Sequence, residues 1–172
     1  MRQIILGIDP GSRCTGYGLI WTQGSEQGCI AHGCIRTESE SFADRLVEIY
    51  SNLLKIISEY KPHEGAIERV FVQKNVQSAL KLGQARGVAL VAMAIQGLQV
   101  AEYSPREIKQ AAVGYGAADK EQVQRMVSAL LQLKTKPQAD AADALAIAVC
   151  HANTRLLASQ MLNATQKWKE AL

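Results

Sequence analysis

The sequence predicts an α/β protein with a five-stranded mixed sheet and helices on both of its faces. The first third of the 172 residues contains three short apolar runs separated by turn signals, which is typical of strands joined by hairpins. The remainder alternates helix-patterned segments with two further apolar runs. Hairpins give antiparallel pairing and helical crossovers give parallel pairing, so both kinds of neighbour are expected in one sheet.

The strands are expected where short apolar runs stop at turn residues. The first, Gln3–Ile8, ends at the turn signal Asp-Pro-Gly-Ser. The second and third, Tyr17–Thr22 and Cys29–Thr37, are separated by a polar stretch containing glycine, which suits a hairpin loop. A buried fourth strand is expected at His63–Val70, and a fifth at Leu98–Tyr103 stops before a Ser-Pro pair.

The helices are predicted from apolar residues that recur at spacings of three and four. The first helix spans Phe42–Tyr60, with Ser41 as its expected cap and Pro62 just beyond its end. A long helix of small and apolar residues follows at Val76–Gln96. Three more helices complete the prediction, at Arg106–Val113, Lys120–Leu133 and Ala139–His151.

The composition describes an ordinary globular chain. Hydrophobic residues make up 48% and charged residues 20%, and the length suits one domain. The net charge of +3 is compatible with a polyanionic partner but does not indicate one. The start MRQIILGID lacks the features of a signal peptide, and no apolar run predicts a membrane span, so a cytoplasmic protein with no membrane partner is expected. We therefore expect reduced cysteines acting as small core residues, at Cys14, Cys29, Cys34 and Cys150.

Four acidic residues have positions that suit a shared metal site. Asp9 ends the first strand, and Glu68 lies near the end of an apolar strand, where a carboxylate is costly unless it is paired or bound to metal. Asp140 and Asp143 are three residues apart on an alanine-rich helix, so both project from one face. Each aspartate alone has an ordinary explanation as a turn or helix-capping residue. Together, oxygen donors of this kind predict Mg²⁺ or Mn²⁺ rather than zinc.

Four segments of the chain resemble those of the RuvC family of Holliday-junction resolvases. They are GIDPGSRCTGYG, AIERVF, KLGQARGVAL and QADAADALAIA, they follow the family's order, and the resemblance extends to about His151. It implies a ribonuclease H-like fold, with residues 1–153 as the nuclease domain and residues 154–172 as a C-terminal tail or frayed helix. It also implies a homodimer, and a partnership with the branch-migration motor complex of the same pathway.

The resemblance implies a structure-selective endodeoxyribonuclease acting in recombination and repair. Four-way DNA junctions would be resolved by paired, symmetric, metal-dependent nicks that leave 5′-phosphate and 3′-hydroxyl ends. Asp9, Glu68, Asp140 and Asp143 correspond to the family's catalytic, metal-binding carboxylates. Two Mg²⁺ ions per active site are expected, with Mn²⁺ able to substitute: one activates a water and the other stabilises the leaving oxygen. By analogy Asp9 bridges both ions, with Glu68 on one and the aspartate pair mainly on the other.

Several basic residues and one aromatic are candidate DNA contacts. Lys109 and Lys120 match lysines that the family uses at its active site, and Lys120 is also expected to be catalytic. Without the resemblance, a lysine on a helix is ordinarily just solvated. Phe71 heads a polar, basic loop, where it either stacks beside an unpaired base or anchors the loop. Further candidates for contacts with the DNA backbone are Lys74, Lys81, Arg86 and Arg106.

The long helix at Val76–Gln96 carries small residues at four-residue spacing, namely Ala79, Gly83 and Gly87. Glycine inside a helix costs about 1 kcal/mol relative to alanine, so a packing role is expected. Two roles remain open: a dimer contact, or a close fit of this helix against the sheet.

Three other functions compete with a resolvase. An actin-like or sugar-kinase-like ATPase also places Asp-x-Gly after a first strand, but it needs a second related domain for which this chain is too short. Another nuclease of the same fold would share the acids without needing KLGQARG or the Phe71 loop. A catalytically silent junction-binding protein would have no use for four carboxylates gathered without metal.

Overall fold

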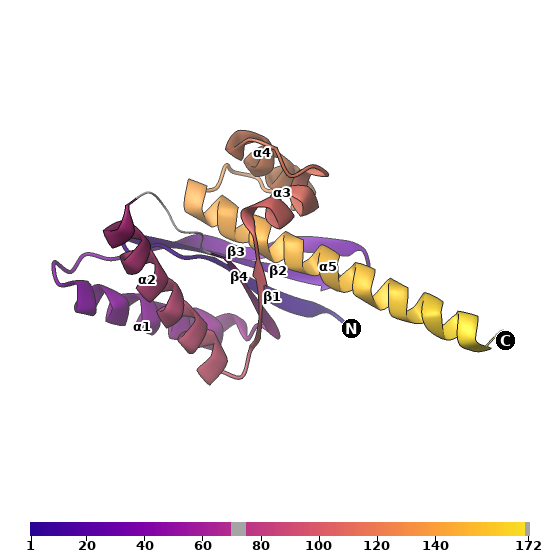
Figure 1. The fold of residues 1–172 in the computed structure, drawn as a ribbon, viewed down its shortest axis with the longest axis horizontal. Coiled ribbons are helices and arrows are strands. Elements are labelled where there is room, and N and C mark those ends of the chain that lie inside the picture. Colours follow the sequence, from indigo (N-terminus) through magenta and orange to yellow (C-terminus); the bar gives the residue numbers. More distant parts are fainter. Residues whose placement is uncertain (70–74, 171–172) are drawn as a thin grey trace.

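The computed structural model describes residues 1–69 and 75–170, with side chains through residue 161. It confirms the predicted mixed sheet of five strands with helices on both faces (Figure 1). The strands are β1 (Gln3–Asp9), β2 (Cys14–Gln23), β3 (Glu26–Arg36), β4 (Glu64–Glu68) and β5 (Gln99–Tyr103). The helices are α1 (Phe42–Tyr60), α2 (Val76–Ile95), α3 (Pro105–Val113), α4 (Lys120–Leu130) and α5 (Ala139–Glu170).

The strand order β3-β2-β1-β4-β5 brings two acidic strand ends together. β1 and β3 are each antiparallel to β2, while β1, β4 and β5 run parallel. Ile8 of β1 is level with Ile67 of β4, so the next residues, Asp9 and Glu68, end adjacent strands at the same edge. On the other side of β1, Asp9 is paired with Gly16 of β2.

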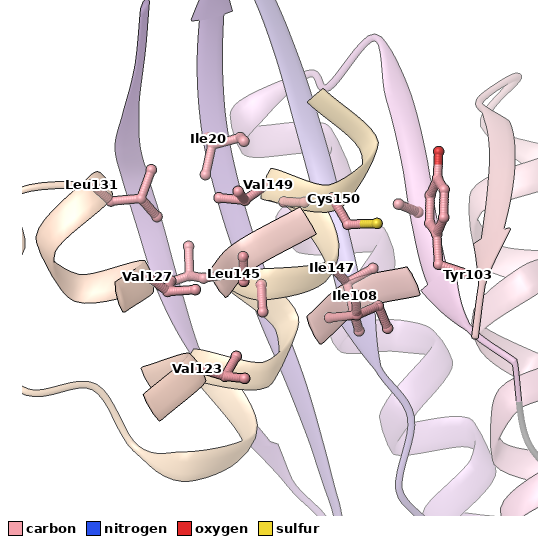
Figure 2. Close-up of a cluster of buried hydrophobic side chains, with 14 of the residues drawn as sticks. Ile20, Tyr103, Ile108, Val123, Val127, Leu131, Leu145, Ile147, Val149 and Cys150 are labelled. Atoms are coloured by element: carbon pink, nitrogen blue, oxygen red, sulfur yellow. The ribbon is translucent and has the colours of Figure 1, made fainter. Parts of the chain in front are cut away.

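The sheet separates two hydrophobic cores. α1 and α2 cover one face, and α5 covers the other with α3 and α4 packed against it (Figure 1). Side chains alternate along β1, so that Ile5 belongs to the α5 side and Leu6 and Ile8 belong to the α1 side. Figure 2 shows the α5-side core, where Leu145 and Ile147 of α5 lie among residues from α3, α4 and the sheet.

Two helices end at least three residues away from their predicted ends. α4 ends at Leu130 rather than Leu133, and Gln132 just beyond it has a left-handed backbone with φ of 51°. α5 continues to Glu170 instead of ending at His151, and Figure 1 shows it extending past the sheet. The chain after residue 153 contains no proline or glycine that would stop a helix, which explains the longer helix.

Glycines in β1 and β2 allow the backbone of α5 to lie directly on the sheet. A Cβ atom added to Gly7 would lie 2.1 Å from the carbonyl oxygen of Ala144, and one added to Gly16 would lie 2.0 Å from that of Asp140. Gly18 is covered by α5 in the same way. No side chain fits at these positions, so the three glycines set the distance between the first turns of α5 and the end of β1.

A buried polar network anchors the middle of α5 to the parallel strands. The Nδ1 atom of His151 lies 2.8 Å from the hydroxyl of Tyr103, and its Nε2 atom lies 2.6 Å from the carboxylate of Glu64. Arg155 reaches the same carboxylate at 3.0 Å. Both ring nitrogens of His151 are therefore engaged by contacts within the fold.

One helix among the described residues, α2, is long and apolar enough to cross a membrane, judged by length and composition only. The sequence pattern had not predicted a span. A single helix of this kind is weak evidence, because a core helix of a globular protein passes the same test. α2 packs Ala85, Ala89, Ala92 and Met93 into the core beside α1.

We predict that Gly7→Ala lowers the free energy of unfolding by about 1–3 kcal/mol, because the added methyl group meets the α5 backbone. Urea unfolding would measure the loss. Gly28→Ala is the matched control in β3, since its Cβ would meet only the indole of Trp21, a partly exposed side chain that can move. Equal losses in the two variants would contradict the proposed close contact between α5 and β1.

Candidate active site

The structure brings the four predicted acids to one edge of the sheet. Carboxylate oxygens of Asp9, Asp140 and Asp143 lie within 4.8 Å of one another. Glu68 ends the neighbouring strand, interacts electrostatically with Asp9 and Asp143, and lines a cleft together with Asp143. Residues from β1, β4 and α5, far apart in the sequence, therefore form one acidic cluster.

Local contacts fix the turn that follows Asp9. The hydroxyl of Thr15, a residue only 1% exposed, donates to the carbonyl oxygen of Gly11 at 2.8 Å. The Gly11 amide donates back to the same hydroxyl at 3.3 Å. At the start of α5, the Gln138 side chain accepts a hydrogen bond from the Arg36 guanidinium at 3.2 Å. Thr15 is a positioning residue that the sequence pattern did not single out.

Burial and mutual repulsion disfavour ionisation of the acids. Burial, together with the negative charges of Asp143, Glu68 and Asp140, raises the pKa of Asp9 to about 8, and Lys120 offsets only part of this rise. Burial also raises the pKa of Glu68, with Asp143 adding to the effect and Lys120 and Lys109 opposing it. The nearby lysines therefore do not balance the negative charge of the carboxylates, and an oxygen-ligated divalent cation would supply the missing positive charge.

Lys120 lies against the acidic cluster. Its Nζ atom is 2.6 Å from Oδ2 of Asp143, and this hydrogen bond is the main reason that the pKa of Lys120 is raised. Asp119 caps α4 through a reciprocal capping box with Gln122, which makes Lys120 the first residue of the helix. Its side chain is 59% exposed, so the ammonium group remains accessible to a ligand.

A cleft of about 230 Å³ adjoins the acids. Its charged lining includes Lys109 of α3, whose helix begins with a capping box formed by Ser104 and Glu107. The cleft thus combines two lysines and two carboxylates with apolar side chains. Its lining residues are Glu68, Pro105, Ile108, Lys109, Lys120, Val123, Asp143, Ala146 and Ile147.

Arg86 has a different environment from that expected of a DNA contact. Its Nε atom donates to the main-chain oxygen of Glu68 at 2.9 Å, and its guanidinium forms an ion pair with Glu102. The side chain is only 18% exposed. Arg86 therefore fixes the end of the strand that carries Glu68, which makes it a positioning residue. Its contact with DNA stays a prediction.

The remaining predicted DNA contacts differ in what the structure says of them. Lys81 is exposed on α2, as a contact with a phosphate backbone requires. Lys109 is half-buried in the cleft described above. Phe71 and Lys74 lie outside the described residues.

Two cysteines lie at the site, which corrects the expectation that all four are core residues. Cys150 is buried and Cys29 packs against the core, as expected. Cys14 and Cys34 are instead half-buried beside Asp140. Burial, with hydrogen bonds to Asp140 and Cys34, raises the pKa of the Cys14 thiol to about 12. Pairing of β2 with β3 brings these thiols together, and the spacing of cysteines along the chain carries no sign of it.

Comparisons with known proteins agree with this architecture. The family profile of crossover junction endodeoxyribonuclease RuvC matches residues 5–151. The chain is 62% identical over 163 residues to the crossover junction endodeoxyribonuclease RuvC of Coxiella burnetii (strain RSA 493 / Nine Mile phase I), with 95% of each chain covered. It is 59% identical over 151 residues to the protein of the same name from Hahella chejuensis, with 88% of each chain covered.

A solved structure described as T. thermophilus RuvC in complex with Holliday junction substrate has the same fold. It aligns with a TM-score of 0.85 at 33% identity, covering 91% of this chain and 96% of that one. The family profile spans the strands and the helix that carry the four acids, and the two bacterial relatives and this structure each align over most of both chains. The chain therefore belongs to the RuvC family of crossover junction endodeoxyribonucleases.

Proposed function

We propose that this chain resolves four-way (Holliday) DNA junctions by paired, symmetric, Mg²⁺-dependent nicks, leaving 5′-phosphate and 3′-hydroxyl ends. The observation that carries the proposal is the convergence of Asp9, Glu68, Asp140 and Asp143 beside a cleft that also contains Lys109 and Lys120. Family membership supports a four-way junction as the substrate, because one relative's structure is described as a complex with a Holliday junction.

The donor set fits a hard divalent cation. Carboxylate oxygens are the ligands that Mg²⁺ and Mn²⁺ prefer, and the raised pKa of Asp9 reflects a cluster with too little positive charge. We expect Asp9, Glu68, Asp140 and Asp143 to hold two ions. When bound, these ions would favour ionisation of the attacking water and offset negative charge on the leaving oxygen.

The neighbouring residues would orient the DNA strand. Lys120 is close enough to Asp143 to neutralise part of its charge, and its exposed ammonium can reach a phosphate at the mouth of the cleft. Lys109 offers a second cation in the lining of the cleft, where it interacts electrostatically with Glu68. Arg86 would act indirectly, because its hydrogen bond to the main chain of Glu68 holds the end of β4 in place.

We also propose a homodimer in which α2 contacts a second copy of the chain. Apart from neighbouring backbone of α2 itself, no atom of the described residues lies within 4 Å of the Cβ positions of Gly83 and Gly87, so this face does not pack against the sheet. Exposed apolar side chains continue the same stripe along the helix. They are Val76, Leu80, Val91 and Ile95. A dimer supplies the two active sites that paired nicking requires.

Two further expectations accompany this proposal. Residues 1–153 would form the nuclease domain and residues 154–172 its C-terminal extension. A partnership with the branch-migration motor complex of the same pathway is proposed from the family alone.

We predict that Asp9→Asn lowers the rate of junction cleavage at least about a hundredfold, because it removes a metal ligand. The assay compares a synthetic mobile four-way junction with a linear duplex of the same sequence, in Mg²⁺, in Ca²⁺ and with chelator. Wild-type protein should make paired, ligatable nicks on the junction in Mg²⁺ only. Asp44→Asn, a change at an exposed aspartate on α1, is the matched control and should cut normally.

Two results of that assay would overturn the proposal. Binding of the junction without cutting in Mg²⁺ would indicate a silent junction-binding protein. Equal cutting of the linear duplex would leave a nuclease but remove its selectivity for junctions.

Asp9→Asn should also change how stability depends on pH in metal-free protein. The pKa of Asp9 is raised from 3.8 to about 8 in the folded chain, so the folded state binds this proton more tightly than the unfolded state. The resulting stabilisation is present at low pH and is lost as pH rises through about 8. The variant should thus be more stable than wild type by at least about 1 kcal/mol above that pH.

Urea unfolding in chelator at a series of pH values would measure this difference. It should shrink as the pH falls, since Asp9 is then protonated in the folded wild-type protein. A difference that stays constant across the pH range would show that the Asp9 carboxyl titrates normally, and would contradict the raised pKa.

Val91→Glu should convert the dimer into monomers, because it buries a charge in the proposed α2 contact. Light scattering coupled to size-exclusion chromatography gives the mass directly. Val47→Glu is the matched control, since Val47 is 61% exposed on α1 and Val91 is 51% exposed on α2. A mass unchanged by Val91→Glu would place the dimer contact elsewhere.

A further inference from the structure

We propose that Cys14, Cys34 and Asp140 form a second metal site, which binds a thiophilic divalent ion such as Zn²⁺ and withdraws Asp140 from the catalytic acids. The sulfur atoms of the two cysteines and a carboxylate oxygen of Asp140 all lie within 4.8 Å of one another. The three residues are half-buried, which leaves the site open to an ion from solvent.

The strand register explains why these groups meet. Cys34 of β3 is paired with Gly16 of β2, and Cys14 lies two residues before Gly16, so the two thiols are diagonal neighbours on one face. Gly16 has no side chain, and the main-chain oxygen of Asp140 lies 2.0 Å from the position that its Cβ would take. The start of α5 is thereby seated over the thiol pair, and the Asp140 carboxylate contacts the Cys14 thiol.

The donor chemistry separates this site from the acidic cluster. Two sulfurs and one oxygen suit Zn²⁺, which accepts three protein ligands with water as the fourth. Mg²⁺ has little affinity for sulfur and prefers oxygen donors. Each thiol would release its proton to solvent as the sulfur becomes a ligand, so no oxidant or reductant is involved.

The two sites compete because they share Asp140. Its carboxylate belongs both to the group with Cys14 and Cys34 and to the group with Asp9 and Asp143. An ion held by the thiols would draw this carboxylate away from the catalytic ions. Zn²⁺ should therefore inhibit cleavage by competing with Mg²⁺, a consequence that rests on the nuclease function proposed above.

The binding site can be tested without any nuclease assay. Full-length protein, kept reduced with a phosphine, would be titrated with Co²⁺, whose sulfur-to-metal charge-transfer band reports thiolate ligation. Wild-type protein should show this band, and Zn²⁺ should abolish it. Cys14→Val and Cys34→Ala should each lose most of the band. Cys29→Ala should keep it, because Cys29 packs against the core on a different part of β3.

Cleavage of a four-way junction in Mg²⁺ supplies the second measurement. The Zn²⁺ concentration for half inhibition should rise at least about tenfold in Cys34→Ala and stay unchanged in Cys29→Ala. The proposed metal site would be overturned if wild-type protein showed no charge-transfer band. It would also be overturned if the band persisted in both Cys14→Val and Cys34→Ala. Equal Zn²⁺ sensitivity of wild type and Cys34→Ala would overturn the competition for Asp140. If wild-type protein does not cleave junctions at all, the proposed function fails, while the Co²⁺ spectra still decide the metal site.

Discussion

The active site depends on the close contact between the backbone of α5 and the central strands. Gly7 and Gly16 leave no side chain between the sheet and the helix, so that the carbonyl oxygens of Ala144 and Asp140 come within 2.1 Å and 2.0 Å of the positions that Cβ atoms would take. Asp9 is paired with Gly16, and Asp140 lies over Gly16. The register of two strands and the approach of one helix therefore bring two carboxylates together without any direct bond between them.

This arrangement has an electrostatic cost that the rest of the fold must offset. Carboxylates held together in a partly buried place lose hydration and repel one another, and the high pKa of Asp9 results first from its burial and then from that repulsion. Lys120 neutralises only part of the charge, through its ion pair with Asp143. The hydrophobic cores on both faces of the sheet contribute the stability that keeps the acids in place without metal. A bound divalent ion would relieve the repulsion between the carboxylates and so stabilise the fold.

Local patterns predicted the elements and the acids, while features that depend on strand register were missed. α1 was predicted at Phe42–Tyr60 because its apolar periodicity and its Ser41 cap are both local signals. The four acids could be predicted because strand ends and helix spacing are readable along the chain. The approach of Cys14 to Cys34 depends on how β2 pairs with β3, and the reach of Arg86 depends on a long side chain crossing to β4. Neither the cysteine pair nor the Arg86 contact can be predicted from the spacing of residues along the chain.

Helix α2 connects the proposed dimer contact with the active site. Its exposed stripe includes Gly83 and Gly87, and Arg86, which lies between them in the sequence, donates a hydrogen bond to the main chain of Glu68. A second copy packed on the stripe would restrict movement of α2 and so keep the Arg86 hydrogen bond to the end of β4. Since Glu68 is the acid contributed by β4, dimer formation would order one of the four proposed metal ligands. In this arrangement the contact that provides two active sites also helps to complete each of them.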